Sequence, residues 1–194
     1  MIICGIDYSV EGPALCIFNL DKHGKDGFCF DNCVFYYMTQ SKKKEIATKN
    51  IFGLHVPRKE YKDKPSILWY KRIADWVTNI MEEEGVNQSF IEDYAFSRNS
   101  RSTTILAENG AILKLGLTIW DIPYQTVPST AWKKHCIDRG NANKQFIFET
   151  MDNGPELLKL FDMTDGSKGP ISDIIDSYYI CKFGVDKVVE KSYN

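Results

Sequence analysis

Hydrophobic and polar residues are arranged along the chain first with a strand-like and then with a helix-like period. Near the N-terminus, short apolar segments separated by turn-forming residues predict three strands over 1–7, 14–19 and 28–38, connected as a meander. Between 67 and 84, apolar residues recur three and four positions apart, which is typical of an amphipathic helix. The chain therefore begins as a small sheet and then adds a helix.

The rest of the chain alternates between predicted strands and helices. We expect strands over 89–94 and 124–127, and helices over 103–117, 143–151 and 171–183. This order predicts an α/β fold: a mixed five-stranded sheet, in which an antiparallel meander is followed by β/α units, flanked by helices. With 194 residues, 43% of them hydrophobic, we expect one domain over 1–194 with a basic connection at about 40–64.

Charge changes this picture only locally. The formal net charge of −2 is not the basic signature typical of a nucleic-acid-binding protein. Residues 41–64, however, carry eight Lys and Arg against three acids, and residues 97–144 carry seven against three. Such segments can follow phosphates beside an acidic site. For the run from Lys42 to Lys44 alone, a solvated loop is the favoured interpretation.

Four acidic residues stand out because of the segments that carry them. Asp7 and Glu92 end two predicted strands, and a carboxylate buried there needs a cation. Asp173 and Asp176 are three positions apart on the last predicted helix, so their side chains share one face. Alone, Glu92 reads as a strand-end charge and Asp173 as a favourable helix-dipole charge. Together, four carboxylates suit a pair of Mg²⁺ ions for phosphodiester hydrolysis.

The same residues carry a resemblance to the RuvC Holliday-junction resolvases of the ribonuclease H-like superfamily. MIICGIDYS is similar to their first-strand motif, FIEDYAF to the second acid with its following aromatic residue, and SDIIDSYYI to their terminal helix. The phrases IEDYAFSRNSRS and TVPSTAWKKHCIDRGNANK resemble bacteriophage-encoded members most closely. The resemblance runs from residue 1 to about 183 and implies the ribonuclease H-like form of the fold.

The resemblance also implies roles for individual residues. Asp7, Glu92, Asp173 and Asp176 match the metal-binding catalytic quartet, and Lys133 and Lys144 match two basic positions that support catalysis and phosphate binding. An aromatic after the second acid stacks on bases in this family. With the cations of the second basic segment, the expected DNA contacts are Tyr94, Phe96, Arg98, Arg101, Lys133, Lys134 and Lys144.

Two departures from the family pattern concern the first turn and the basic connection. Asp7 is followed by Tyr8 and Ser9, where cellular members usually have Asp-Pro-Gly, which changes the turn and not the metal ligand. The segment 40–64 is longer than in the family. It is either a DNA-binding insertion or a mobile loop without a role, and the sequence leaves both interpretations open.

The activity that follows from the resemblance is cleavage of four-way DNA junctions in recombination or phage replication. Two Mg²⁺ ions per site, replaceable by Mn²⁺, would support hydrolysis that leaves 5′-phosphate ends. Two opposed incisions imply a homodimer, and the helix over 103–117 is either a candidate interface or a well-buried core helix. No apolar stretch approaches the roughly 20 residues of a membrane span, and no export signal is evident. We therefore expect a cytoplasmic protein, in the host cell if it is phage-encoded.

Three other interpretations compete with junction resolution. An actin-like ATPase or sugar kinase shares the Gly-Ile-Asp start but needs a glycine-rich phosphate turn and a much longer chain. A module that binds branched DNA without cutting it would not require four acids. A nuclease with broader specificity for branched DNA or for RNA/DNA hybrids has the same acids, and only the local phrases favour junction resolution over it.

Overall fold

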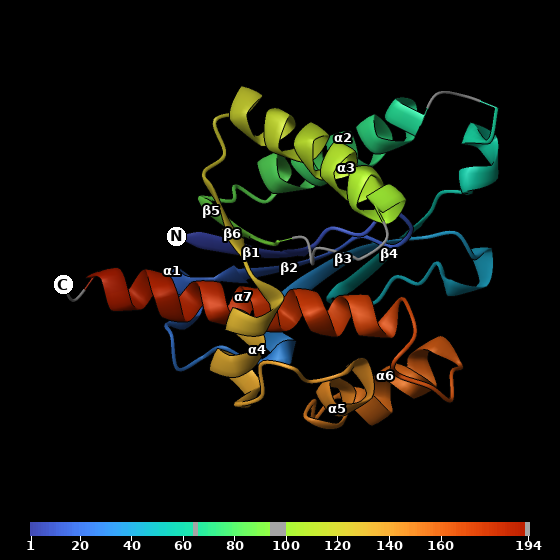
Figure 1. The fold of residues 1–194 in the computed structure, drawn as a ribbon. Coiled ribbons are helices and arrows are strands. Elements are labelled where there is room, and N and C mark those ends of the chain that lie inside the picture. Colours follow the sequence, from blue (N-terminus) through green and yellow to red (C-terminus); the bar gives the residue numbers. More distant parts are fainter. Residues whose placement is uncertain (64–65, 94–99, 193–194) are drawn as a thin grey trace.

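A mixed sheet lies between two layers of helices in the computed structural model, which describes residues 1–63, 66–93 and 100–192 (Figure 1). Among these residues the sheet has six strands in the order β4-β3-β2-β1-β5-β6. The strands are β1 Ile2–Asp7, β2 Ala14–Asn19, β3 Cys33–Thr39, β4 Ile51–His55, β5 Gln88–Glu92 and β6 Tyr124–Val127. β1, β2 and β3 form the antiparallel meander, while β4 pairs parallel with β3, and β5 and β6 extend the sheet in parallel from β1. The expected mixed sheet with flanking helices is confirmed.

Helices cover both faces of this sheet. α2 (Ser66–Glu83) and α3 (Ser100–Ile119) lie on one face, and α7 (Ile171–Ser192) crosses the other, with α4, α5 and α6 beside it (Figure 1). The bounds of these smaller helices are α4 Ser129–Ile137, α5 Lys144–Glu149 and α6 Gly154–Phe161, and the short α1 is Leu20–His23. Each face has its own apolar cluster, one under α7 and one under α2 and α3.

The alternation of side chains along β1 sends one set of residues toward α7 and the other toward α2 and α3. Cys4 and Ile6 belong to the cluster under α2 and α3, whereas Ile3 belongs to the cluster under α7. Gly5 faces α7 at very close range, because a Cβ built on it would lie 2.2 Å from the Cys181 backbone nitrogen. The same two-residue period directs Asp7 toward α7, and the glycine allows the helix to lie directly on the strand.

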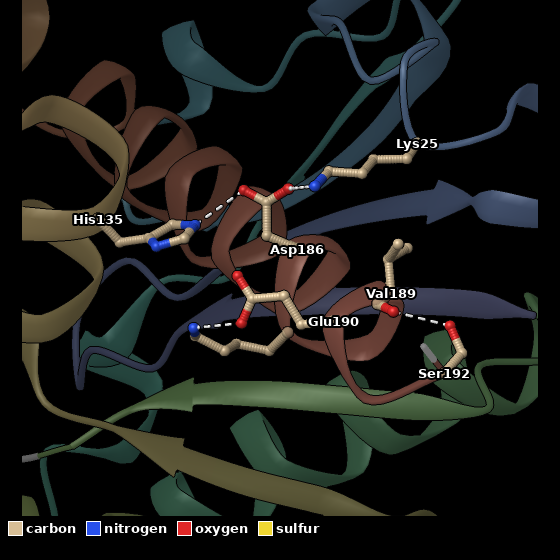
Figure 2. A network of polar contacts seen from close by, with 7 residues as sticks. Lys25, His135, Asp186, Val189, Glu190 and Ser192 are labelled. Atoms are coloured by element: carbon tan, nitrogen blue, oxygen red, sulfur yellow. Dashed lines mark hydrogen bonds and ion pairs between the residues drawn. The ribbon is translucent and has the colours of Figure 1, made fainter. Parts of the chain in front are cut away.

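The C-terminal half of α7 is held by ion pairs around Asp186. This carboxylate lies 3.1 Å from Lys25 Nζ and 2.9 Å from His135 Nε2, so it connects α7 with α4 and with the segment before β3 (Figure 2). On the last turns, Lys187 pairs with Glu190 at 2.6 Å, and the Ser192 hydroxyl donates to the Val189 carbonyl oxygen. Helix α4 is thereby fixed against the helix that carries two of the four acids.

The structure corrects several element predictions. The sheet has six strands and not five, because residues 51–55 of the predicted basic connection pair with β3 as an edge strand. The third strand begins at Cys33 and not at residue 28, since residues 30–32 form a 3₁₀ turn. The Asn50 side-chain amide donates to the carbonyl oxygens of Phe30 in this turn and of Cys33 directly after it. α4 and α6 were not predicted, because short helices leave little periodic signal. α7 runs on to Ser192, well beyond the predicted end at residue 183.

Candidate active site

Asp7 and Glu92 lie side by side at one end of the sheet. β1 and β5 are parallel, and Ile6 pairs with Ile91, so the acids that follow end neighbouring strands at the same edge. The Asp7 side chain is buried, and this burial raises its pKa well above the usual range; the nearby carboxylates of the site raise it further. Two strands have therefore brought two carboxylates together in a place where their charges are poorly solvated.

Asp173 and Asp176 add two carboxylates from α7. They lie on one face of the helix, one turn apart, and that face packs on β1 because of the close approach at Gly5. Burial raises the pKa of both, and for Asp176 the charges of Glu92 and Asp173 help to raise it to about 7. The structure thus brings all four predicted acids into one site, each influencing the protonation of its neighbours.

Lys144 is the cation at the centre of this acidic site. It is the first residue of α5, where the Asn143 side chain caps the helix. Its Nζ lies 3.6 Å from Asp173 Oδ1 and 3.9 Å from Asp176 Oδ2. Burial lowers the pKa of Lys144, but Asp173, Asp176 and Asp7 outweigh this effect and leave the pKa raised. Lys144 therefore stays charged and offsets part of the negative charge of the site.

A second cation, Lys133 of α4, acts on Glu92. Burial raises the pKa of Glu92, while the Lys133 charge and the Trp132 indole N–H lower it, with a further contribution from Lys144. The indole nitrogen is fully buried and makes no hydrogen bond of normal geometry with any residue in the described part of the chain. Both predicted basic residues, Lys133 and Lys144, thus act on the carboxylates, one from α4 and one from α5.

The other predicted DNA contacts are less informative. Tyr94, Phe96 and Arg98 lie outside the described residues, and Arg101 lies within α3 where its side chain is not described. Lys134 is exposed on α4 and donates to the Asp138 carbonyl oxygen of its own helix end. These five residues remain predictions of DNA contacts.

Ser172 is a site residue that the sequence reasoning did not assign. Its hydroxyl accepts a 3.2 Å hydrogen bond from Lys144 Nζ and donates one of 3.0 Å to Asp173 Oδ1. It therefore connects the lysine to the carboxylate and orients both. Its position directly before Asp173 was visible in the sequence, but only the packing of α5 against α7 shows its partner.

The donor set of the site has the chemistry of a site for hard divalent cations. Four carboxylates supply only oxygen ligands, which Mg²⁺ and Mn²⁺ prefer. Burial raises the pKa of all four carboxylates, and for Asp7 and Asp176 the neighbouring acids raise it further, while Lys144 lowers it at each of the four. As the side chains stand, no three acidic, His or Cys groups of the described residues converge into a metal-binding cluster. The charge and chemistry fit such an ion, which would have to draw the carboxylates together.

A separate apolar groove lies between α2 and α3, on the opposite face of the sheet. It has a volume of about 300 Å³ and is lined mainly by apolar side chains of the two helices. Leu115 and Ile119 beside it are 57% and 71% exposed, and Trp120 is half exposed. Exposed apolar surface of this extent is typical of an interaction site. Among the described residues, no helix is long and apolar enough to cross a membrane.

Fold and site together define an α/β protein with a ribonuclease H-like fold, in which four carboxylates lie at the ends of β1 and β5 and on α7. Among solved structures, the chain is similar to RuvC of Thermus thermophilus, with a TM-score of 0.59 and 10% identity, over 98% of this chain and 97% of that one. It is also similar to T. thermophilus RuvC in complex with Holliday junction substrate, with a TM-score of 0.57 and 10% identity, over 97% of this chain and 96% of that one. No protein-family model matches the sequence, and no curated protein matches it. The chain has the RuvC fold, as predicted; its closeness to phage-encoded members stays a prediction.

Proposed function

We propose that the protein is a metal-dependent endonuclease that resolves four-way DNA junctions. The observation that carries this proposal is the set of four carboxylates, with Lys144 among them, at the ends of β1 and β5 and on α7 of a RuvC fold. T. thermophilus RuvC has been solved with a Holliday junction substrate, and the proposal extends that substrate to this chain.

Asp7, Glu92, Asp173 and Asp176 would hold the divalent cations, two Mg²⁺ or in their place Mn²⁺. Bound there, the ions supply a nucleophilic water and stabilise negative charge on the phosphate oxygens during hydrolysis. The expected products carry 5′-phosphate and 3′-hydroxyl ends. Without such cations the four carboxylates would repel a DNA phosphate, which is the physical reason for a strict metal requirement.

The chain's own residues supply the rest of the site. Lys144 is the side chain best placed to bind a non-bridging phosphate oxygen, because its ammonium lies beside two of the acids and Ser172 orients it. Lys133 acts on Glu92 and lowers the pKa of that carboxylate, although burial outweighs this effect and leaves the pKa raised. Trp132 offers its buried N–H to the same carboxylate. Each of these groups favours charged carboxylates, which are the form that binds a cation.

The test is cleavage of a labelled four-way junction in Mg²⁺ by the wild-type protein and by Asp7→Asn. Linear duplex, a flap and an RNA/DNA hybrid serve as comparison substrates, and Asp31→Asn, on an exposed turn, controls for a substitution of the same kind away from the site. We expect paired, symmetric nicks in the junction alone, and a loss of about 10³-fold or more with Asp7→Asn, since removal of a single electrostatic group already costs roughly 10²–10³-fold.

Other outcomes of this experiment would replace the proposal. Cutting of every branched substrate would indicate a broader debranching nuclease, and cutting of the hybrid a ribonuclease H-type activity. Tight junction binding by the wild-type protein without any cleavage would favour a binding module.

The same proposal includes a homodimer whose interface is the apolar groove between α2 and α3. Two opposed incisions in one junction need two sites, and a two-fold axis supplies them from identical chains. In support, Leu115 and Ile119 of α3 line one side of the groove as an apolar ridge and are largely exposed, so that this surface offers apolar contacts to a second copy. The predicted interface helix, over 103–117, lies within α3.

A further inference from the structure

The lysine-rich turn between β3 and β4 brings one cation to the edge of the acidic site. Lys42 pairs with Glu45 and Lys43 is exposed, but Lys44 Nζ donates a 2.8 Å hydrogen bond to the carbonyl oxygen of Gly169. The three lysines of the turn are therefore not equivalent, because the ammonium group of Lys44 is bonded to the segment that precedes α7.

Gly169 connects Lys44 with Asp173, because it accepts the hydrogen bond from Lys44 and also contacts the Asp173 carboxylate. A Cβ built on Gly169 would lie 2.5 Å from Asp173 Oδ2, so the glycine backbone packs directly against that carboxylate. Lys144, in contrast, approaches the other oxygen of Asp173, Oδ1. The Lys44 charge lowers the pKa of Asp173, after the larger influences of burial, Lys144 and Ser172. Asp173 thus has Lys144 within ion-pair distance of Oδ1, and the charge of Lys44 acts on it more weakly.

The position of Lys44 is fixed by the sheet. The buried Tyr37 hydroxyl donates to the Lys44 carbonyl oxygen and accepts a 3.2 Å hydrogen bond from the Ile46 N–H. Gly53 on the neighbouring strand leaves room for this hydroxyl, because a Cβ there would lie 2.3 Å from it. Glu45 also accepts a 3.0 Å hydrogen bond from the His55 N–H. A cation held in place in this way loses little freedom on binding a ligand.

A cleft of about 460 Å³ opens beside Lys44. It is lined by Ser9 and Gly12 of the β1–β2 turn, by residues 38–41 at the end of β3, and by Asp173. Binding clefts for small ligands have volumes of roughly 300–1,000 Å³, which is enough for a nucleotide unit. Gln40 also lines a second cleft of about 400 Å³, bordered by Arg58, Lys59 and Lys62. The two clefts share Gln40 and therefore adjoin, which gives one path from Asp173 over Lys44 to Lys59 and Lys62. Arg58 on this path pairs with Glu11, which lines the first cleft.

We propose that Lys44 binds a DNA phosphate adjoining the scissile one, and that this path carries the same strand away from the site of hydrolysis. The inference rests on the proposed nuclease function and adds a DNA contact to it. An ammonium group has three N–H donors, and the bond to Gly169 uses one, so the others can bind phosphate oxygens. The basic connection then contributes to DNA binding through one positioned lysine.

The first measurement is the affinity for a labelled four-way junction, without divalent ions, over a series of KCl concentrations. All variants are made in the Asp7→Asn protein, so that binding is read without cleavage. Lys44→Ala should weaken binding roughly tenfold, the effect of losing one charged hydrogen bond, and should reduce the slope of log K against log salt by about one. The matched control Lys43→Ala, one residue away and exposed, should change affinity less than about twofold.

The second measurement locates the phosphate. Methylphosphonate substitutions remove the charge of one junction phosphate at a time on either side of the cleavage position. At one flanking position, the neutral phosphate should weaken junction binding by the Asp7→Asn protein. At that position it should cause no additional loss of affinity when Lys44→Ala is also present. Lys44→Arg should restore most of the affinity, and thermal melting should show that each variant is folded.

The outcomes separate this inference from the function on which it rests. Equal losses of junction affinity for Lys44→Ala and Lys43→Ala would overturn the role of Lys44. So would a loss from Lys44→Ala that adds to the loss from the methylphosphonate at every position. Either result would leave the nuclease proposal intact. Lys44→Ala can also be made in the protein that retains Asp7, and its cleavage rate measured. A slower cleavage rate there, together with unchanged junction affinity and an unchanged salt slope, would mean that Lys44 only positions Asp173. Absence of junction binding by the wild-type protein would overturn both proposals.

Discussion

The two faces of the sheet are covered in opposite ways. On one face, α7 packs on the sheet and places Asp173 and Asp176 near Asp7 at the end of β1, and burial raises the pKa of all three carboxylates. On the other face, α2 and α3 enclose an apolar cluster and leave Leu115 and Ile119 exposed. One face buries charge and the other exposes apolar surface. Both arrangements are unfavourable for the chain alone, so each is best explained by something that binds there.

This difference between the two faces indicates which kind of partner would stabilise each of them. Buried, mutually repelling carboxylates are stabilised by cations, and among the four acids Lys144 lies within ion-pair distance of Asp173 and Asp176. An exposed apolar ridge beside an apolar groove is stabilised by another apolar surface, and we propose a second copy of the chain. Substitutions that remove one of these features should therefore change one property and leave the other unaffected.

Among the substitutions that test this difference between the faces, the largest effect is expected from Lys144→Ala. Removing the cation beside Asp173 and Asp176 takes away the group placed to bind the phosphate, and the cleavage rate should fall roughly 10²–10³-fold. Single-turnover cleavage of the junction measures it. Lys22→Ala, which removes an exposed lysine of α1 at the other end of β1 and β2 from Asp7, should retain nearly full activity. If the two variants behaved alike, Lys144 would have no special place in the mechanism.

A smaller effect is expected from Leu115→Glu on the opposite face. A charge on the exposed ridge should weaken self-association about 100-fold, because the substitution occurs twice in a two-fold interface. Light scattering after size-exclusion chromatography, over a range of concentrations, measures the change. Thr118→Glu adds the same charge at an exposed position of α3 outside the groove lining and should leave the dimer intact. A wild-type protein that is monomeric at high concentration would exclude this interface.

The smallest effect is a gain in stability from Asp176→Asn. The pKa of Asp176 is about 7 in the folded protein, against roughly 4 in the unfolded chain. Between these values the folded state binds the proton more tightly, so the free energy of unfolding falls as pH rises from about 4 to about 7. Without metal at pH 8, Asp176→Asn should be more stable than wild type by on the order of 1–3 kcal/mol, and near pH 4 equally stable.

Urea denaturation in EDTA across this pH range measures the difference. The exposed Asp31→Asn serves as control and should follow the wild-type profile. Addition of Mg²⁺ should narrow the gap at pH 8, since an ion that binds the folded wild-type protein stabilises it. Parallel profiles for wild type and Asp176→Asn would mean that the carboxylate is not destabilised by its surroundings.

Much of the fold and part of the site could be predicted from local patterns. The meander, the helix that became α2 and the strand β6 follow from residue periods that act over a few positions, and β6 has the predicted bounds. The edge strand β4 was missed because it has only five residues and Gly53 lowers its strand propensity. It forms by pairing with the edge of β3, and the glycine leaves room for the Tyr37 hydroxyl. α4 and α6 were too short to show a period, although α4 carries Trp132 and Lys133.

By itself the sequence determined which acids end the strands, that Asp173 and Asp176 share a helix face, and that the chain forms a mixed sheet with helices. These properties depend on the two-residue and 3.6-residue periods of the backbone, which can be read along the chain. Only the tertiary structure decided that β1 and β5 pair in parallel, so that Asp7 and Glu92 meet, and that α5 delivers Lys144 to them. It also decided which one of three adjacent lysines approaches the site. Distances across the chain and the burial that shifts a pKa depend on packing between segments remote in sequence, which no local pattern specifies.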